Sequence, residues 1–190
     1  SVKLMGRKKI GAKNSKVGIL LATTSYPRYL IKPFILPSAF NDYMQWTKRF
    51  SEALPKDLLS LLCVRPHYQD YGLNFVQRLR EHIPNLKLDS WDNTFLKSLE
   101  EHRLYVCDHN STTFIEALVA NKPTILFWNP KDNQLLPEAK YYFDMLRKSG
   151  ILFDSPEAAA TAVGNIYDDV ESWWNDSDRQ KTISIFCDQY

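Results

Sequence analysis

Short apolar runs alternate along the chain with longer segments in which apolar residues recur every three or four positions. The short runs predict strands that are buried on both faces of a sheet, and the longer segments predict amphipathic helices. The predicted strands are 17–23, 60–66, 86–89, 103–108, 123–128 and 151–153, and the predicted helices are 37–54, 74–83, 93–100, 111–121, 136–150, 155–174 and 177–190.

This alternation predicts an α/β fold. Six strands that are each followed by a helix favour a Rossmann-like, doubly wound, mostly parallel six-stranded sheet with helices on both faces. In such a sheet, ligands bind at the carboxyl ends of the strands, beside helix N-termini, where the strand order reverses. Polar residues directly after strands are therefore the first candidates for a site.

Composition bounds the domain organisation. With 190 residues and 44% hydrophobic content, the chain can bury one substantial core, and its composition excludes disordered and fibrous proteins. Residues 1–16 are basic and lack apolar periodicity, which predicts a linker or disordered segment; a nuclear or lipid-binding tail is the alternative. We expect residues 17–190 to form one domain. Because the chain opens at Ser1 without Met, we interpret it as a piece of a longer protein.

The net charge and the cysteine content indicate which binding partners and which cellular compartment to expect. A net charge of +2 gives no reason to expect nucleic acid as a partner. Three widely spaced cysteines are typical of free thiols in a reducing compartment, and no apolar stretch reaches the length of a membrane span. We therefore expect a cytoplasmic protein.

The stretch CDHNSTTFIEALVANKPTILFW, residues 107–128, has the densest polar content at a predicted strand end. If Asn110 or Ser111 caps the following helix, its first-turn N–H groups and the hydroxyls of Thr112 and Thr113 form an oxyanion or phosphate site. The alternative is ordinary capping, because Thr113 and Glu116 have the spacing of a capping box.

The stretch CVRPHYQDYG, residues 63–72, follows the second strand and should face the same edge. Arg65 offers a bidentate fork for phosphate, and His67 is a candidate catalytic acid for the departing phosphate; a surface histidine is the alternative. Residues 70–72 should form a turn in which Gly72 takes a positive φ.

The loop TTSYPRYLIKP, residues 23–33, follows the first strand. Thr24 and Ser25 are candidates for contacts with phosphate or with an acceptor, and a Pro-containing loop that only packs its aromatic residues is the alternative. Since no Cys or His pair has zinc-ligand spacing, we expect no metal.

The run FIEALVANKP resembles the Glu-Ala-Leu segment of the nucleotide-sugar-binding C-terminal domain of GT-B glycosyltransferases. Together with SYPRYL, VRPHYQDYG, GILFDSPEAAA and ESWW, it resembles transferases of bacterial O-antigen clusters, which are related to capsule, Kdo and CDP-glycerol polymer transferases. The resemblance extends over about residues 17–190.

The resemblance implies roles for particular residues. Glu116 would bind the ribose hydroxyls of a donor, and Asp108, eight positions earlier, would support the site or orient His109. Related capsule-type transferases often have His-Pro where this chain has His67-Tyr68, which weakens the role of His67.

A GT-B enzyme has two Rossmann-like domains, and this chain has room for one. The resemblance therefore implies a donor-binding domain of a glycosyltransferase in surface-polysaccharide synthesis, inactive alone, that binds a nucleotide-activated sugar and requires an N-terminal domain of the same protein. It implies no cofactor or metal, and it leaves room for peripheral association with the inner face of the membrane through a lipid-linked acceptor. The alternatives are a stand-alone flavodoxin-like nucleotide-binding or regulatory module and a sugar-nucleotide epimerase-like relative.

Overall fold

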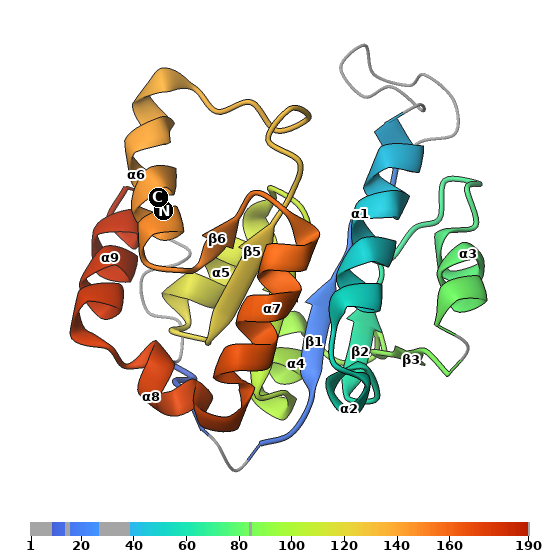
Figure 1. The fold of residues 1–190 in the computed structure, drawn as a ribbon, viewed down its shortest axis with the longest axis horizontal. Helices are drawn as coiled ribbons and strands as arrows, with labels where there is room; N and C mark the ends of the chain where they lie inside the picture. The colour runs from blue at the N-terminus through green and yellow to red at the C-terminus, as the bar shows by residue number, and fades with distance from the viewer. Residues whose placement is uncertain (1–8, 14–15, 27–38, 84, 190) are drawn as a thin grey trace.

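The computed structural model describes residues 9–13, 16–26, 39–83 and 85–189. Its centre is a six-stranded sheet in the order β3-β2-β1-β4-β5-β6, in which every neighbouring pair is parallel (Figure 1). The strands are β1 (Ile19–Ala22), β2 (Leu62–Arg65), β3 (Lys87–Leu88), β4 (Leu104–Cys107), β5 (Thr124–Phe127) and β6 (Leu152–Phe153). The predicted doubly wound α/β fold is confirmed.

Helices cover both faces of this sheet. They are α1 (Ala39–Ala53), α2 (Lys56–Leu59), α3 (Phe75–His82), α4 (Phe95–Glu101), α5 (Thr112–Val119), α6 (Pro137–Lys148), α7 (Pro156–Ile166), α8 (Val170–Trp174) and α9 (Ser177–Cys187), with a 3-10 turn, η1 (Tyr167–Asp169), between α7 and α8. Figure 1 shows α1 and α7 on the near face of the sheet and α4 and α5 on the far face.

The alternation of side chains along each strand divides the core in two. Ile19 and Leu21 of β1 pack with α1, α3 and α7, whereas Leu20 and Ala22 pack with α4, α5, α6 and α9. All four residues of β1 are buried, as expected for a central parallel strand with both faces covered.

The structure differs from the prediction mainly at the ends of elements. The predicted helix 155–174 is wrong as a single helix: it breaks at η1, because Asp169 accepts a hydrogen bond from the Ser172 N–H and so caps a new helix, α8. The four-residue helix α2 was not predicted separately. Residues 37 and 38, at the predicted start of α1, lie outside the described residues.

The order of the strands reverses between β1 and β4, which start crossovers to opposite sides of the sheet. Ala22 pairs with Cys107 at their carboxyl ends, so Thr23 and Asp108 both emerge at this switch point. Arg65, the last residue of β2, pairs with Ala22 on the other side. The predicted placement of Thr23, Arg65 and Asp108 at strand C-termini is confirmed.

Candidate functional site

Asp108 lies at the centre of a buried hydrogen-bond network at the switch point. It is 3% exposed. The Tyr43 hydroxyl lies 2.9 Å from both carboxylate oxygens and donates to them, and the Thr47 hydroxyl donates to Oδ2 at 3.0 Å. Tyr43 and Thr47 are one turn apart on the buried face of α1, so the first crossover helix holds the end of β4. Because these contacts are internal, Asp108 joins the end of β4 to α1, and its predicted supporting role in a ligand site remains a prediction.

His109 pairs with Asp108 at this edge. Its Nδ1 lies 3.0 Å from Asp108 Oδ1 and 3.6 Å from the Cys107 sulfur. Burial lowers the pKa of His109, but the Cys107 sulfur and the hydrogen-bonded Asp108 carboxylate outweigh this effect and raise the pKa to about 10. His109 is therefore an imidazolium cation at neutral pH, and it compensates the buried carboxylate beside it.

The N-terminus of α5 follows this pair directly. Ser111 occupies the N-cap position in extended conformation, but its side chain makes no capping hydrogen bond; its Oγ lies 3.0 Å from Thr113 Oγ1 instead. Thr113 is already inside the helix, so the capping box predicted as the alternative, with Thr113 as its cap, is not formed. By contrast, Thr94, Ser155 and Asp176 each cap their own helices through the side chain.

The first turn of α5 therefore presents backbone N–H groups that Ser111 does not satisfy. Asn110 and Thr112 beside it are exposed, and Ser111 and Thr113 are partly buried. Glu116 lies one turn further along the helix and is also partly buried. Except for the capping geometry, the roles predicted for these five residues remain predictions.

The loop after β1 is tied to the same network. The Thr24 N–H donates to the Tyr43 hydroxyl at 2.8 Å, so one hydroxyl group joins the ends of β1 and β4. Thr24 and Ser25 are partly buried here, while residues 27–33 of the predicted loop lie outside the described residues.

Two buried polar atoms at this edge have no hydrogen-bond partner among the described residues: Thr23 Oγ1, directly after β1, and Trp128 Nε1, directly after β5. Buried polar groups in native proteins are nearly always paired, so each exception calls for a ligand, a water molecule or a structural reason. Thr23 and Trp128 directly follow β1 and β5, the two strands that pair with β4.

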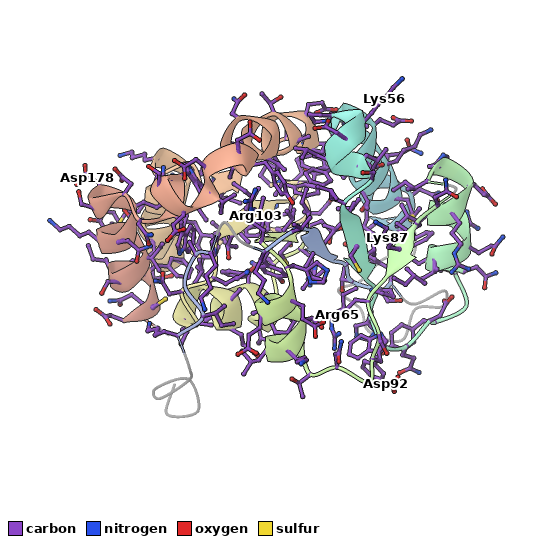
Figure 2. All side chains as sticks on the ribbon, turned by 90° about the horizontal axis from the view of Figure 1, so that it is seen from below. Lys56, Arg65, Lys87, Asp92, Arg103 and Asp178 are labelled. Atoms are coloured by element: carbon purple, nitrogen blue, oxygen red, sulfur yellow. The ribbon has the colours of Figure 1, made fainter. Side chains whose placement is uncertain are left out.

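Arg65 does not turn its guanidinium toward the switch point. The guanidinium forms a buried ion pair with Asp89 and donates to Ser98 Oγ, at 3.2 Å, and to the Asn93 carbonyl, at 3.1 Å. It also lies 4.1 Å from the centre of the Trp91 ring. Figure 2 shows Arg65 beside the loop that carries Asp92. This arrangement favours a structural role, holding the β3–α4 loop, over the predicted phosphate contact.

His67 is partly exposed in the loop after β2. Its Nδ1 lies 3.1 Å from the Gln69 carbonyl oxygen, and its ring packs against Tyr68 and Tyr71, so its described contacts stay within its own loop. The structure does not bring His67 into the Asp108 network, and its catalytic role remains a prediction. The predicted turn is confirmed: Gly72 has φ of +88°, and Asp70 accepts its N–H at 2.8 Å.

Two further searches of the described residues concern metals and membranes. No three His, Cys, Asp or Glu side chains gather there as metal ligands would. Over the same residues, no helix combines the length and apolar character needed to cross a bilayer. Whether the reaction is metal-independent stays a prediction.

The sequence matches the model of the LIC12162 family transferases over residues 1–190. The chain belongs to this transferase family. None of the curated proteins matches it significantly. Membership makes the open turn of α5, at the switch point of a transferase sheet, the principal candidate for a substrate contact.

Sequence reasoning missed two residues of the Asp108 network in this LIC12162-family chain, Tyr43 and Thr47. Both lie within the predicted helix 37–54. The available signal was a hydroxyl pair at i and i+4 on an otherwise apolar helix face, which is the pattern needed to satisfy one buried polar partner.

Proposed function

We propose that this transferase domain binds the nucleotide-sugar donor of a glycosyltransferase acting in bacterial surface-polysaccharide synthesis. The observation that carries the proposal is the uncapped first turn of α5, at the point where the sheet reverses its strand order. Helix N-termini bind phosphate through free N–H groups and the positive end of the helix dipole. The donor diphosphate occupies this turn, and Ser111, Thr112 and Thr113 supply further hydrogen bonds.

The Asp108 network supports the proposal because it fixes the turn without occupying it. Tyr43, Thr47 and His109 satisfy the carboxylate from inside the protein. A preorganised site loses less entropy when its ligand binds than a mobile one. Glu116, one turn into α5, would accept hydrogen bonds from the ribose hydroxyls, as the resemblance to GT-B transferases implies.

The acceptor site and the catalytic base belong, in this proposal, to an N-terminal domain of the same protein. The isolated 190 residues would then bind nucleotide but transfer no sugar above background. A lipid-linked acceptor would bring the complete enzyme to the inner face of the membrane.

Calorimetric titration with CMP, CDP, UDP, GDP and their sugars tests donor binding. The chain should bind the nucleotides of one base more tightly than the others. Ser111→Ala/Thr112→Ala should lower the affinity for the nucleoside diphosphate of that base by about tenfold or more, because each hydrogen bond to a charged group contributes roughly 1.5–3 kcal/mol. Thr161→Ala/Ser172→Ala, which removes the same two groups from exposed helix positions, is the matched control.

Glu116→Gln separates the two halves of the proposed site. It should weaken nucleotides more than inorganic pyrophosphate, because the proposed partners of Glu116 are ribose hydroxyls. If the chain binds none of the nucleotides, or if Ser111→Ala/Thr112→Ala lowers only the melting temperature, the donor site is excluded and these residues serve the helix alone.

A further inference from the structure

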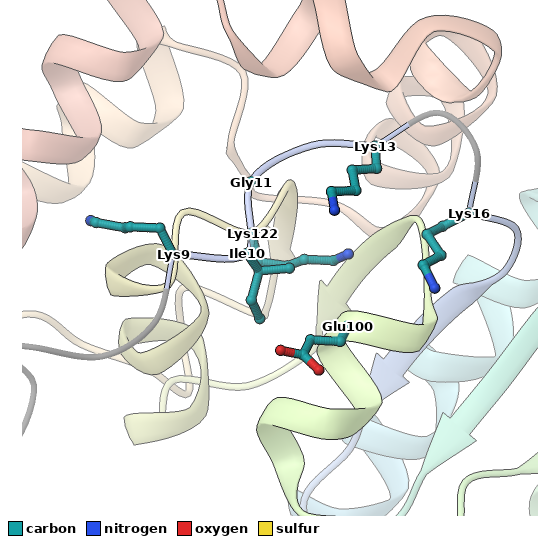
Figure 3. Close-up of a pocket in the computed structure, with 7 residues that line it drawn as sticks. All are labelled: Lys9, Ile10, Gly11, Lys13, Lys16, Glu100 and Lys122. Atoms are coloured by element: carbon teal, nitrogen blue, oxygen red, sulfur yellow. The ribbon is translucent and has the colours of Figure 1, made fainter.

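A cavity opens at the edge of the sheet opposite the switch point, where the strands begin. It has a volume of about 210 Å³ and is lined by Lys9, Ile10, Gly11, Lys13, Lys16, Glu100 and Lys122 (Figure 3). Lys16 precedes β1, Glu100 precedes β4 and Lys122 precedes β5. Because all strands are parallel, this cavity lies at the amino ends and is distinct from the switch point.

Lys122 is the buried cation of this cavity. It follows Asn121, which ends α5 with a left-handed φ of +53°, and it is 2% exposed. Its ammonium group donates to the His102 carbonyl, and it has no carboxylate partner among the described residues. Lysine is almost never buried unless it is paired, because removing an ammonium ion from water is costly.

Two further lysines enclose the same space. Lys13 and Lys16 are exposed residues whose side chains line the cavity, and Figure 3 shows the amines of Lys13 and Lys122 directed into it with Lys16 beside them. Lys9 points away and donates to the Val119 carbonyl at 2.9 Å, near the negative end of the α5 dipole. Among the described residues that line the cavity, Glu100 is the one carboxylate.

The segment that carries Lys9 and Lys13 is attached to the domain. The Ile10 N–H donates to the Ala120 carbonyl at 2.7 Å, and the Ile10 side chain packs against the α5 side of the core. Residues 9–13, part of the segment predicted to be a linker, thus lie against the end of α5. This attachment holds Lys13 at the cavity.

Charge in the cavity is unbalanced in the described residues. Burial and, to a smaller extent, the charge of the neighbouring Lys16 lower the pKa of Lys122 to about 8. The charged residues that line the cavity with Lys122 are Lys9, Lys13, Lys16 and Glu100. Because the Lys9 amine is directed away, three lysine amines and one carboxylate remain in the described part of the cavity. An anion in the cavity would offset the energetic cost of burying the Lys122 charge and would reduce the repulsion between the lysines.

We propose that this lysine cavity binds the phosphate group of an anionic ligand. Lysine ammonium groups bind phosphate as point charges with several donors, and three of them face one space here. The cavity is smaller than the roughly 300–1,000 Å³ of pockets for organic ligands, so it suits a phosphate or diphosphate group rather than a whole nucleotide. The proposal does not depend on the proposed donor site, which lies at the other edge.

Inorganic pyrophosphate and lipid vesicles serve as the two probes, because the phosphate could come from a soluble molecule or from a headgroup. Pyrophosphate is titrated calorimetrically at fixed ionic strength into the wild-type chain, Lys13→Gln/Lys16→Gln and the control Lys56→Gln/Lys181→Gln. The control removes two exposed lysines elsewhere. Each titration is repeated in the Ser111→Ala/Thr112→Ala background, which removes the proposed donor contacts. Co-sedimentation with phosphatidylglycerol vesicles, and with phosphatidylcholine vesicles as reference, uses the same proteins.

Lys13→Gln/Lys16→Gln should weaken binding by about tenfold or more in both backgrounds, while the control changes it less than about twofold. Loss of pyrophosphate binding alone identifies a soluble phosphate as the ligand, and loss of binding to phosphatidylglycerol vesicles identifies a lipid headgroup. If Lys13→Gln/Lys16→Gln binds both probes as the control Lys56→Gln/Lys181→Gln does, the lysine cavity is not a phosphate site. The same holds if neither probe binds the wild-type chain. Circular dichroism confirms that the variants compared are folded.

Discussion

The Tyr43 hydroxyl donates to the Asp108 carboxylate at 2.9 Å and accepts the Thr24 N–H at 2.8 Å, so a single oxygen atom joins α1 to the ends of β1 and β4. The burial of Tyr43 and then the charge of Asp108 raise the pKa of this phenol well above its usual value, so it stays a donor at any physiological pH.

Tyr43→Phe should lower the free energy of unfolding by about 2–3 kcal/mol, because it leaves a buried carboxylate with one donor fewer and an amide without its acceptor. Chemical denaturation measures the change. Tyr26→Phe is the matched control: its ring packs 5.1 Å from that of Tyr43, and it should cost less than about 0.5 kcal/mol. Equal losses in the two variants would show that the Tyr43 hydroxyl contributes nothing specific.

His109 should make stability depend on pH. Its folded pKa of about 10 lies above the ordinary value of 6.5, so the folded state holds a proton that the unfolded state releases between these values. The stabilisation is complete below pH 6.5 and is lost as the pH rises through about 10, an effect of up to about 4 kcal/mol by pH 9.5.

Denaturation of the wild type and of His109→Asn at pH 6 and 9.5 measures this dependence. His109→Asn should lose stability mainly at pH 6, so its free energy of unfolding should change less between pH 6 and 9.5 than that of the wild type. His82→Asn, at an exposed position on α3, should keep the pH dependence of the wild type. An unchanged slope in His109→Asn would show that another group controls the alkaline range.

Arg65→Lys should lower the free energy of unfolding by about 2–3 kcal/mol. Lysine keeps the charge opposite Asp89 but cannot also reach Ser98 and the Asn93 carbonyl as the planar guanidinium does. Arg80→Lys, at an exposed position on α3, should change stability by less than about 0.5 kcal/mol. If Arg65→Lys is as stable as the wild type but binds pyrophosphate more weakly, the phosphate role predicted for Arg65 is correct and the structural role is not.

Lys122→Met should raise the free energy of unfolding at pH 7. The pKa of Lys122 falls from 10.5 to about 8 on folding, so its charge opposes folding fully below pH 8, and the opposition fades as the pH rises toward 10.5. After roughly 1 kcal/mol is subtracted for the lost bond to His102, a gain of about 2 kcal/mol remains. Thermal unfolding at pH 7 and 10.5 tests this: the gain should disappear at the higher pH, and a destabilised variant at pH 7 would contradict it.

The placement of Thr23, Arg65 and Asp108 could be predicted because short apolar runs fix where buried strands end, and parallel strands bring those ends to one edge. The contacts beyond that edge could not. Tyr43 lies 65 residues from Asp108 in the sequence. Asp89, which pairs with the Arg65 guanidinium, lies 24 residues after Arg65. Side-chain pairing at such separations depends on tertiary packing, which hydrophobic periodicity does not encode.

The break between α7 and α8 shows the same limit on a shorter scale. Apolar spacing continues through residues 155–174, and only the acceptor on Asp169 separates two helices there. The lysine cavity was also beyond prediction, since Lys122 lies in an ordinary Asn-Lys-Pro turn and the segment 9–13 that lines the cavity with it is distant in sequence.

The division of the core has a consequence for synthesis on the ribosome. The half that contains Phe114 and Trp128 is completed by Trp174, Ile183 and Phe186. Trp174 Nε1 also donates, at 3.0 Å, to the Asn121 carbonyl that ends α5. A nascent chain that has emerged only as far as η1 therefore has α4, α5 and α6 but lacks the three side chains that complete this half of the core. We therefore expect this half of the core to close only after α9 has been synthesised.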